Sequence, residues 1–238
     1  MSRDGSPVLR WVSRSLWDRV PRDHQDSVAA LRRRQWVTVG VVLAGAAMLG
    51  VSLRIEPGSG WFYAATFALA AIWTVGALVS GPIHLGRIAD WRDGDRLVRP
   101  VLAPVLLGLG LSGLFVVGAL VVREIPWLDR QVRSVVDFAD QGSLPLLVLV
   151  TAVNGVAEEI FFRGAVYAAV PRHPVAWTTV AYVIATLATG NIMLAFAAIL
   201  LGVLVGLQRR ASGGILAPIL THCTWSLTML FLLPLLFG

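Results

Sequence analysis

Long apolar stretches alternate with short polar ones along this chain, and their lengths suit membrane-spanning helices. A helix needs about 20 residues to cross a hydrocarbon core of about 30 Å. Seven segments approach that length, at residues 36–53, 60–82, 100–122, 144–169, 175–190, 192–208 and 214–237. The fifth and sixth are short and no charge separates them, so a single bent or re-entrant pair is the alternative there. We predict an all-α, polytopic membrane bundle of about seven transmembrane helices.

Composition supports a membrane protein. Of the 238 residues, 56% are hydrophobic and 14% are charged, whereas soluble domains carry about 25% charged residues. The mean hydropathy is +0.73. A net charge of +6 would suit a nucleic-acid partner, but arginine-rich cytoplasmic loops explain it in a polytopic chain. We expect a multi-pass protein of the cell membrane with no nucleic-acid partner. With Cys223 as the one cysteine, neither a disulfide nor a cysteine-based zinc site is possible within one chain.

The arginines are shared unevenly between the two sides of the predicted bundle. With the N-terminus inside, the cytoplasmic segments hold 15 arginines and the outer segments hold four, Arg54, Arg123, Arg130 and Arg133. Positive residues accumulate in cytoplasmic loops. We therefore predict a cytoplasmic N-terminus and an external C-terminus, with residues 123–143 as a connection between spans.

The chain divides into three regions: a basic cytoplasmic segment at 1–35, three transmembrane helices with their loops at 36–142, and a core of four transmembrane helices at 143–238. In the first region, Leu9, Val12, Leu16 and Val20 recur at helical spacing among arginines. This spacing favours an amphipathic helix that lies at the membrane interface and contacts lipid head groups. A partly disordered basic tail is the alternative.

Three ionisable residues interrupt the apolar segment 144–169, namely Glu158, Glu159 and Arg163. Burying such groups in hydrocarbon is costly, so an ionisable residue inside a span is by default a functional residue with a partner. Glu159 and Arg163 are four residues apart and share a helix face, while Glu158 points about 100° away from Glu159. We expect Glu159 and Arg163 to pair.

A histidine in the last span lies at a similar depth. The fourth span ends near Val170, which places Glu159 about 16 Å from the cytoplasmic side at about 1.5 Å per residue. The last span begins at Gly214, which places His222 about 12 Å from the same side. The other polar residues within spans are Asn154, Thr189, Asn191 and those of the run 221–226. We expect the glutamates and His222 to meet.

Two carboxylates, a guanidinium and an imidazole are suited to activating water. One carboxylate can act as general base. Arg163 can hold the other carboxylate ionised and stabilise an oxyanion. His222 can bind a metal, donate to a substrate carbonyl or orient the water. The alternative is a buried ion-pair network that fixes helix packing, with His222 merely hydrogen-bonded.

This residue set resembles the intramembrane proteases of the CAAX-processing and bacteriocin-processing family, called the CPBP or Abi family. The resemblance covers roughly residues 143–237. The first family motif, two glutamates, three residues and an arginine, matches Glu158, Glu159 and Arg163, with an aromatic pair before the arginine and Gly164 after it. A later motif resembles Ala-Pro-Ile-Leu-Thr-His ending at His222. The resemblance implies a peptidase that acts on a peptide or a membrane protein.

The chain departs from the family pattern at two places. The middle motif normally has an aromatic residue and a histidine four residues later, and we align Ala185 and Thr189 with these two positions. The later motif normally continues to Asn or Asp, and Ser226 stands there instead. Asn191 is a candidate replacement for the lost histidine.

The departures affect the two mechanisms discussed for this family unequally. A catalytic zinc ion normally has three protein ligands. If the protein holds a divalent metal such as zinc, Glu159 and His222 are its candidate ligands. Water activation by carboxylate alone, with Glu158 as the base, tolerates the substitutions better.

We therefore hypothesise an intramembrane endopeptidase that cuts a peptide near the cytoplasmic side. Glu158 is the expected base, Glu159 and Arg163 the electrostatic frame, and His222 the group that orients water or an oxyanion. The alternative is a catalytically impaired relative that serves as a membrane binding, immunity or regulatory protein. A small transporter with a carboxylate proton relay is a third possibility, although the chain shows no pair of interrupted helices in corresponding halves.

Overall fold

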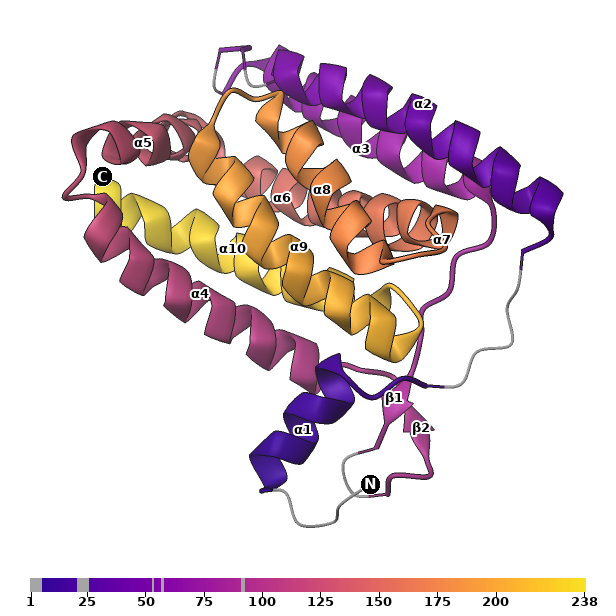
Figure 1. Ribbon diagram of the computed structural model, residues 1–238. Helices are drawn as coiled ribbons and strands as arrows, with labels where there is room; N and C mark the ends of the chain where they lie inside the picture. Colours follow the sequence, from indigo (N-terminus) through magenta and orange to yellow (C-terminus); the bar gives the residue numbers. More distant parts are fainter. Residues whose placement is uncertain (1–5, 21–25, 53, 57, 91–92) are drawn as a thin grey trace.

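The computed structural model describes residues 6–20, 26–52, 54–56, 58–90 and 93–238. Within these residues it is a bundle of long helices with one short hairpin (Figure 1). The helices are α1 Pro7–Leu16, α2 Val28–Ser52, α3 Gly60–Ser80, α4 Leu102–Val122, α5 Pro126–Gln141, α6 Leu144–Glu159, α7 Tyr167–Ala169, α8 Pro174–Leu187, α9 Ile192–Ser212 and α10 Leu216–Phe237. A π-helical segment, η1 Ile160–Val166, joins α6 to α7, and the hairpin pairs β1 Ile88–Ala89 antiparallel with β2 Leu97–Val98.

The protein is an all-α, polytopic membrane bundle, as predicted. Among the described residues, six helical stretches are long and apolar enough to cross a membrane: 28–52, 60–80, 102–122, 144–169, 192–212 and 216–237. The predicted fifth span is the shorter α8, with 14 residues. It is a separate helix packed along α9, and its crossing of the membrane stays a prediction.

Hydrogen bonds between loops mark the two ends of the bundle. At one end, Val20 donates to the carbonyl of Ala211, Arg87 donates to that of Ser212, and Gln35 donates to that of Ala169. All these residues lie in or beside segments that the arginine distribution assigns to the cytoplasm. At the other end, Tyr63 accepts from the backbone of Ser143, and the C-terminus lies near α5 (Figure 1). The side of the membrane that each end faces stays a prediction.

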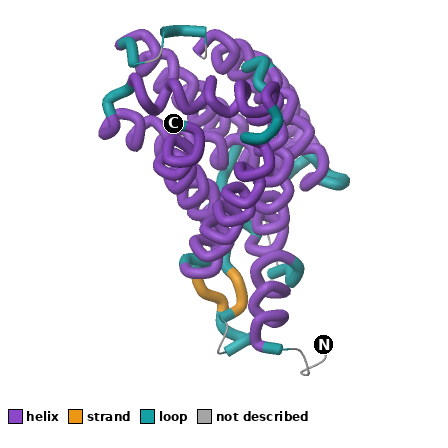
Figure 2. The backbone as a smooth tube through the Cα atoms, turned by 90° about the vertical axis from the view of Figure 1, so that its left-hand side faces the viewer, coloured by secondary structure: helices purple, strands orange, loops and turns teal. Residues whose placement is uncertain are grey.

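Helix α1 and the β1–β2 hairpin form an extension at the predicted cytoplasmic end, as Figure 2 shows. Ser6 caps α1 by accepting from the backbone of Leu9, and Pro7 occupies the first turn, where its missing N–H costs nothing. The guanidinium of Arg14 bonds the carbonyl of Asp90 beside the hairpin. The predicted amphipathic helix therefore forms, although it ends at Leu16 rather than Val20. Residues 1–5 and 21–25 of this region lie outside the described residues.

Helix α5 corrects the prediction that residues 123–143 only connect two spans. Pro126 opens the helix and Gly142 follows its last residue. Val132 and Val136 are buried, and Asp129 and Arg133 pair on the solvent side. The segment carries too many charges to resemble a span, so its helical character rests on one apolar face that needs α4 and α10 to cover it.

Aromatic packing and small residues hold the helices of the site together. Trp73 of α3 stacks on Phe161 and contacts Phe162, at ring-centroid distances of 4.8 and 5.1 Å. On α9, a Cβ added at Gly202 would come within 3.0 Å of Thr179, and one at Gly206 within 3.0 Å of Val175. These two glycines allow α8 and α9 to approach closely.

Candidate active site

The segment that carries the three charged residues changes its helical winding between them. Regular α-helix ends at Glu159, and the next seven residues form the π-helix η1. The N–H of Tyr167 bonds the carbonyl of Phe162, five residues earlier, instead of that of Arg163. Single π turns of this kind are frequent at functional sites. The winding turns Phe161, Phe162 and Arg163 inward, and all three are fully buried.

Glu159 lies at the centre of the cluster. Its Oε1 accepts from Nη1 of Arg163 at 3.1 Å and lies 2.7 Å from Nδ1 of His222. The side chains of Glu159 and Arg163 have no exposure, and that of His222 is 6% exposed. The structure therefore brings together α6, η1 and α10 at one carboxylate oxygen, in agreement with the depth count from the sequence.

Glu158 points away from this pair and meets α8. Its Oε2 accepts a hydrogen bond of 2.6 Å from the hydroxyl of Tyr182. The ring of Tyr182 also covers the guanidinium of Arg163, with Cζ 4.8 Å from the ring centroid, a cation–π arrangement. Glu158 and Tyr182 are half-buried, whereas Glu159 is fully buried. Of the two glutamates, Glu158 is the less buried residue.

Tyr182 is the site residue that reasoning from the sequence missed. The middle motif was aligned with Ala185 and Thr189, but Thr189 lies in the turn after α8, where its hydroxyl accepts from the backbone of Asn191. Tyr182 and Thr186 are also four residues apart, and they lie about one helical turn before Ala185 and Thr189. Aligning the middle motif with Tyr182 and Thr186 would have placed an aromatic residue at the site, and this alignment needs the sequence alone.

The remaining polar residues within the spans lie outside the cluster. Asn191 does not replace a lost histidine, because it caps α9 and donates to the carbonyl of Gln131 on α5. Asn154 donates to the carbonyl of Val150, and Ser226 to that of Cys223. The sequence could not exclude Asn191, since its role depends on α5, which had not been predicted.

An arginine from α9 supports η1 from behind. Nε of Arg209 donates to the main-chain carbonyl of Arg163 at 2.6 Å. Its guanidinium also lies over the ring of Tyr167, 4.9 Å from the centroid. This carbonyl is accessible to Arg209 because the N–H of Tyr167 bonds Phe162 instead. Arg209 thus stabilises the backbone conformation of η1 at Arg163.

A cavity of about 1210 Å³ reaches the site segment from the predicted cytoplasmic end. It is lined by Gly164 within η1, by Tyr167 directly after η1, and by Arg34 and Arg209 on facing helices. Polar and charged walls admit water. The cavity thus reaches η1, but its lining does not include Glu158, Glu159, Arg163 or His222.

The donor set does not fit a zinc ion. Oε1 of Glu159 already has two hydrogen-bonding partners, and Glu158 accepts from Tyr182. Within the described part of the chain, no three His, Cys, Asp or Glu side chains lie close enough to share a metal. A catalytic zinc site normally needs three such ligands. We therefore derive no step through the metal for which Glu159 and His222 were candidate ligands.

Several polar atoms of the cluster have no partner among the described residues. They are Oε2 of Glu159 and the Nε and Nη2 atoms of Arg163. Buried polar atoms normally pair, and unpaired ones in a native site need an explanation. The two unpaired guanidinium donors of Arg163 can stabilise a negative charge that develops during hydrolysis.

The fold and the cluster define a polytopic membrane protein with a buried Glu–Arg–His site. Residues 140–228 match the protein-family model described as Rce1-like, Type II CAAX prenyl endopeptidase. This match confirms the resemblance found in the sequence: over these residues the chain is similar to the CAAX protease and bacteriocin-processing family. Comparisons with curated proteins and with solved structures give no match.

Proposed function

We propose that the protein is an intramembrane endopeptidase of the CAAX-protease type, which cleaves a peptide or membrane protein near the cytoplasmic side of the cell membrane. One observation carries the proposal. A half-buried carboxylate, Glu158, lies beside a fully buried Glu159 that holds both Arg163 and His222. A purely structural ion pair requires no second carboxylate at the same place.

The residues divide the work of hydrolysis. Glu158 takes a proton from water, whose oxygen attacks the carbonyl carbon of the scissile bond, and later passes that proton to the leaving amine. The hydroxyl of Tyr182 orients Glu158 through its 2.6 Å hydrogen bond. Arg163 stabilises the oxyanion through its unpaired N–H groups.

Glu159 acts on the other two groups rather than on the substrate. Accepting Nδ1–H from His222 leaves Nε2 of the ring as an acceptor that orients the attacking water. Accepting from Nη1 of Arg163 fixes the guanidinium beneath the Tyr182 ring. The chemistry therefore uses water and side chains of this chain alone, and we propose no metal cofactor.

The test compares wild-type protein with Glu158→Gln in lipid nanodiscs. The probes are an internally quenched peptide with a prenylated C-terminal CAAX sequence and the same peptide without the lipid. We expect turnover to fall at least about a hundredfold in Glu158→Gln, because a general base contributes about 10²–10⁴-fold. A chelator in the buffer should leave wild-type turnover unchanged.

Membrane proteomics covers substrates that these probes do not represent. New peptide ends that appear with wild-type protein and disappear with Glu158→Gln support the proposal. If wild-type and Glu158→Gln cells show the same peptide ends and neither probe is cut, the protease assignment is wrong. The non-catalytic alternative, in which the cluster fixes the bundle and the protein binds a partner, then takes its place.

A further inference from the structure

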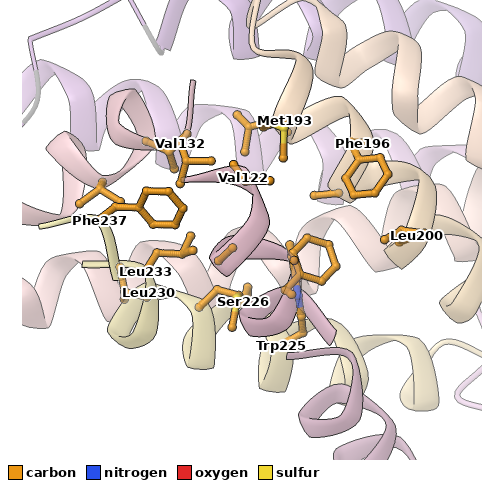
Figure 3. Close-up of a pocket in the computed structure, with 18 of the residues that line it drawn as sticks. Val122, Val132, Met193, Phe196, Leu200, Trp225, Ser226, Leu230, Leu233 and Phe237 are labelled. Atoms are coloured by element: carbon orange, nitrogen blue, oxygen red, sulfur yellow. The ribbon is translucent and has the colours of Figure 1, made fainter. Parts of the chain in front are cut away.

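An apolar cavity of about 390 Å³ lies at the end of the bundle that carries α5. Figure 3 shows side chains from α9 and α10, among them Phe196, Leu233 and Phe237, gathered around it. Its volume lies within the range of about 300–1,000 Å³ typical of ligand pockets. Since α4 and α9 both pack on α10, the cavity occupies the space between them. Leu114, Gly118 and Phe196 of its lining are exposed, so it opens sideways, towards the hydrocarbon of the bilayer.

The inner end of the cavity adjoins the candidate active site. Trp225 and Ser226 line the cavity, and they follow His222 by three and four residues on α10, on the same helix face. The rings of His222 and Trp225 are 6.1 Å apart. With Thr151 of α6, these two residues supply the nitrogen and oxygen atoms of the lining side chains, and the other walls are hydrocarbon or thioether.

Shape and polarity together select the occupant. From Trp225 to Phe237 the cavity follows α10 for about 18 Å, and a helix about 10 Å wide would need roughly 1,400 Å³ over that length. An extended peptide of that length would bring about five residues, each with an N–H and a carbonyl to satisfy. The walls offer few partners for them, and unsatisfied backbone groups are costly in hydrocarbon. A hydrocarbon chain is narrow and carries no such groups.

The outer end of the cavity offers a positive charge. Val132 and Val136 of α5 line the cavity, and Arg133 between them bonds the carbonyl of Phe237 and pairs with Asp129. The Arg133 side chain is 49% exposed, so its guanidinium can also donate hydrogen bonds to a second anionic group. Trp127 of the same helix is also exposed, as tryptophans at a membrane interface are. Arginine binds phosphate through several donors at once.

We propose that this cavity binds one acyl chain of a membrane phospholipid whose phosphate lies against Arg133. The chain enters between α4 and α9 from the surrounding bilayer, and its end contacts Trp225. Bound there, it closes the apolar flank of the Glu159–His222 pair. The proposal does not depend on the proposed peptidase activity, because retention of the lipid is measured without a substrate.

Two glycines of α4 provide a matched pair of variants. A Cβ added at Gly113 or at Gly118 meets nothing within 4 Å, and only Gly118 lines the cavity. Leucine at Gly118 therefore adds its side chain to the cavity wall and reduces the space for a ligand, whereas Gly113 is not a lining residue. Each protein is purified in mild detergent, and co-purified lipid is identified by native mass spectrometry.

We expect wild-type protein and Gly113→Leu to retain the same phospholipid. In Gly118→Leu the retained amount should fall about tenfold or more, which corresponds to a loss in binding free energy of about 1.4 kcal/mol or more. The thermal unfolding midpoint of each variant shows whether it is folded. A phospholipid with a photoreactive group at the end of its acyl chain should label the peptide that contains Trp225 in both Gly113→Leu and wild-type protein.

Arg133→Gln tests the head group. It should weaken retention of the phospholipid and leave retention of an uncharged fatty alcohol unchanged. The proposal is overturned if Gly118→Leu and Gly113→Leu retain equal amounts of lipid, or if the photoreactive chain labels other helices. The proposal is also overturned if the molecule that co-purifies with the wild-type protein from the cell is a peptide or a lipid without phosphate.

Discussion

Glu159 holds Arg163 and His222 on one carboxylate oxygen, at a place where its side chain has no exposure. Removing one partner of a buried ion pair leaves the other charge uncompensated. Glu158 is half-buried, and it accepts a hydrogen bond from Tyr182 instead of pairing with a cation. The two neighbouring glutamates should therefore contribute differently to the free energy of unfolding.

Glu159→Gln should lower the free energy of unfolding by about 3–5 kcal/mol, the range for breaking a buried ion pair. Glu158→Gln should lower it by about 1 kcal/mol or less, because an amide oxygen still accepts from the Tyr182 hydroxyl. Reversible unfolding in mixed micelles, with both variants at the same detergent concentration, measures the difference. Equal losses would mean that Glu158 is also part of the structural frame and would weaken its assignment as the base.

Among the elements, η1 depends most on a neighbour. Its π winding leaves the carbonyl of Arg163 to accept from Arg209, and Tyr167 stacks beneath the same guanidinium. Arg209 itself is 7% exposed, so it is a buried cation committed to this backbone. Arg210, the next residue, lies over the ring of Trp17 instead, 5.3 Å from its centroid. The two adjacent arginines therefore contact different parts of the structure: Arg209 contacts η1, and Arg210 contacts the end of α1.

Arg209→Gln should destabilise η1, and Arg210→Gln should not. A hydrogen bond to a charged group contributes about 1.5–3 kcal/mol, so we expect a loss of about that size in Arg209→Gln. Hydrogen exchange of the backbone amides of residues 160–167 reports on η1 itself. Faster exchange there in Arg210→Gln, or no change in Arg209→Gln, would show that Arg209 does not support this segment.

The same elements show how far the sequence determines the fold. Long apolar runs predicted the spans, and a spacing of four predicted the Glu159–Arg163 pair, since both follow from local helix geometry. The pairing of Glu158 with Tyr182 depends on the rotation of α8 about its axis, which no local pattern specifies. Helix α5 needs neighbouring helices to cover its apolar face. The π winding of η1 has no residue signature of its own.

At the scale of the whole molecule, each long helix runs from one end of the bundle to the other, and loops at each end bond to one another. Helix α8 follows this rule although it is about 21 Å long, less than a hydrocarbon core of about 30 Å. It begins beside the cavity lined by Arg209 and ends where Asn191 bonds α5. If α8 crosses the membrane, local thinning of the bilayer accommodates its short length.

The predicted orientation and the seventh crossing are tested together by cysteine labelling. Replacing Cys223 by serine removes the natural thiol, and single cysteines are then placed at Asp95, Glu124 or Thr189. With the N-terminus inside, a membrane-impermeant maleimide should label Glu124→Cys and Thr189→Cys in intact cells. Asp95→Cys, beside the hairpin, should react only after the membrane is opened. Labelling of Asp95→Cys in intact cells would mean that the predicted orientation is wrong.

Labelling of Thr189→Cys only in opened membranes, with Glu124→Cys still labelled from outside, would mean that α8 does not cross the membrane. In that case the turn between α8 and α9, residues 188–191, would lie within the bilayer.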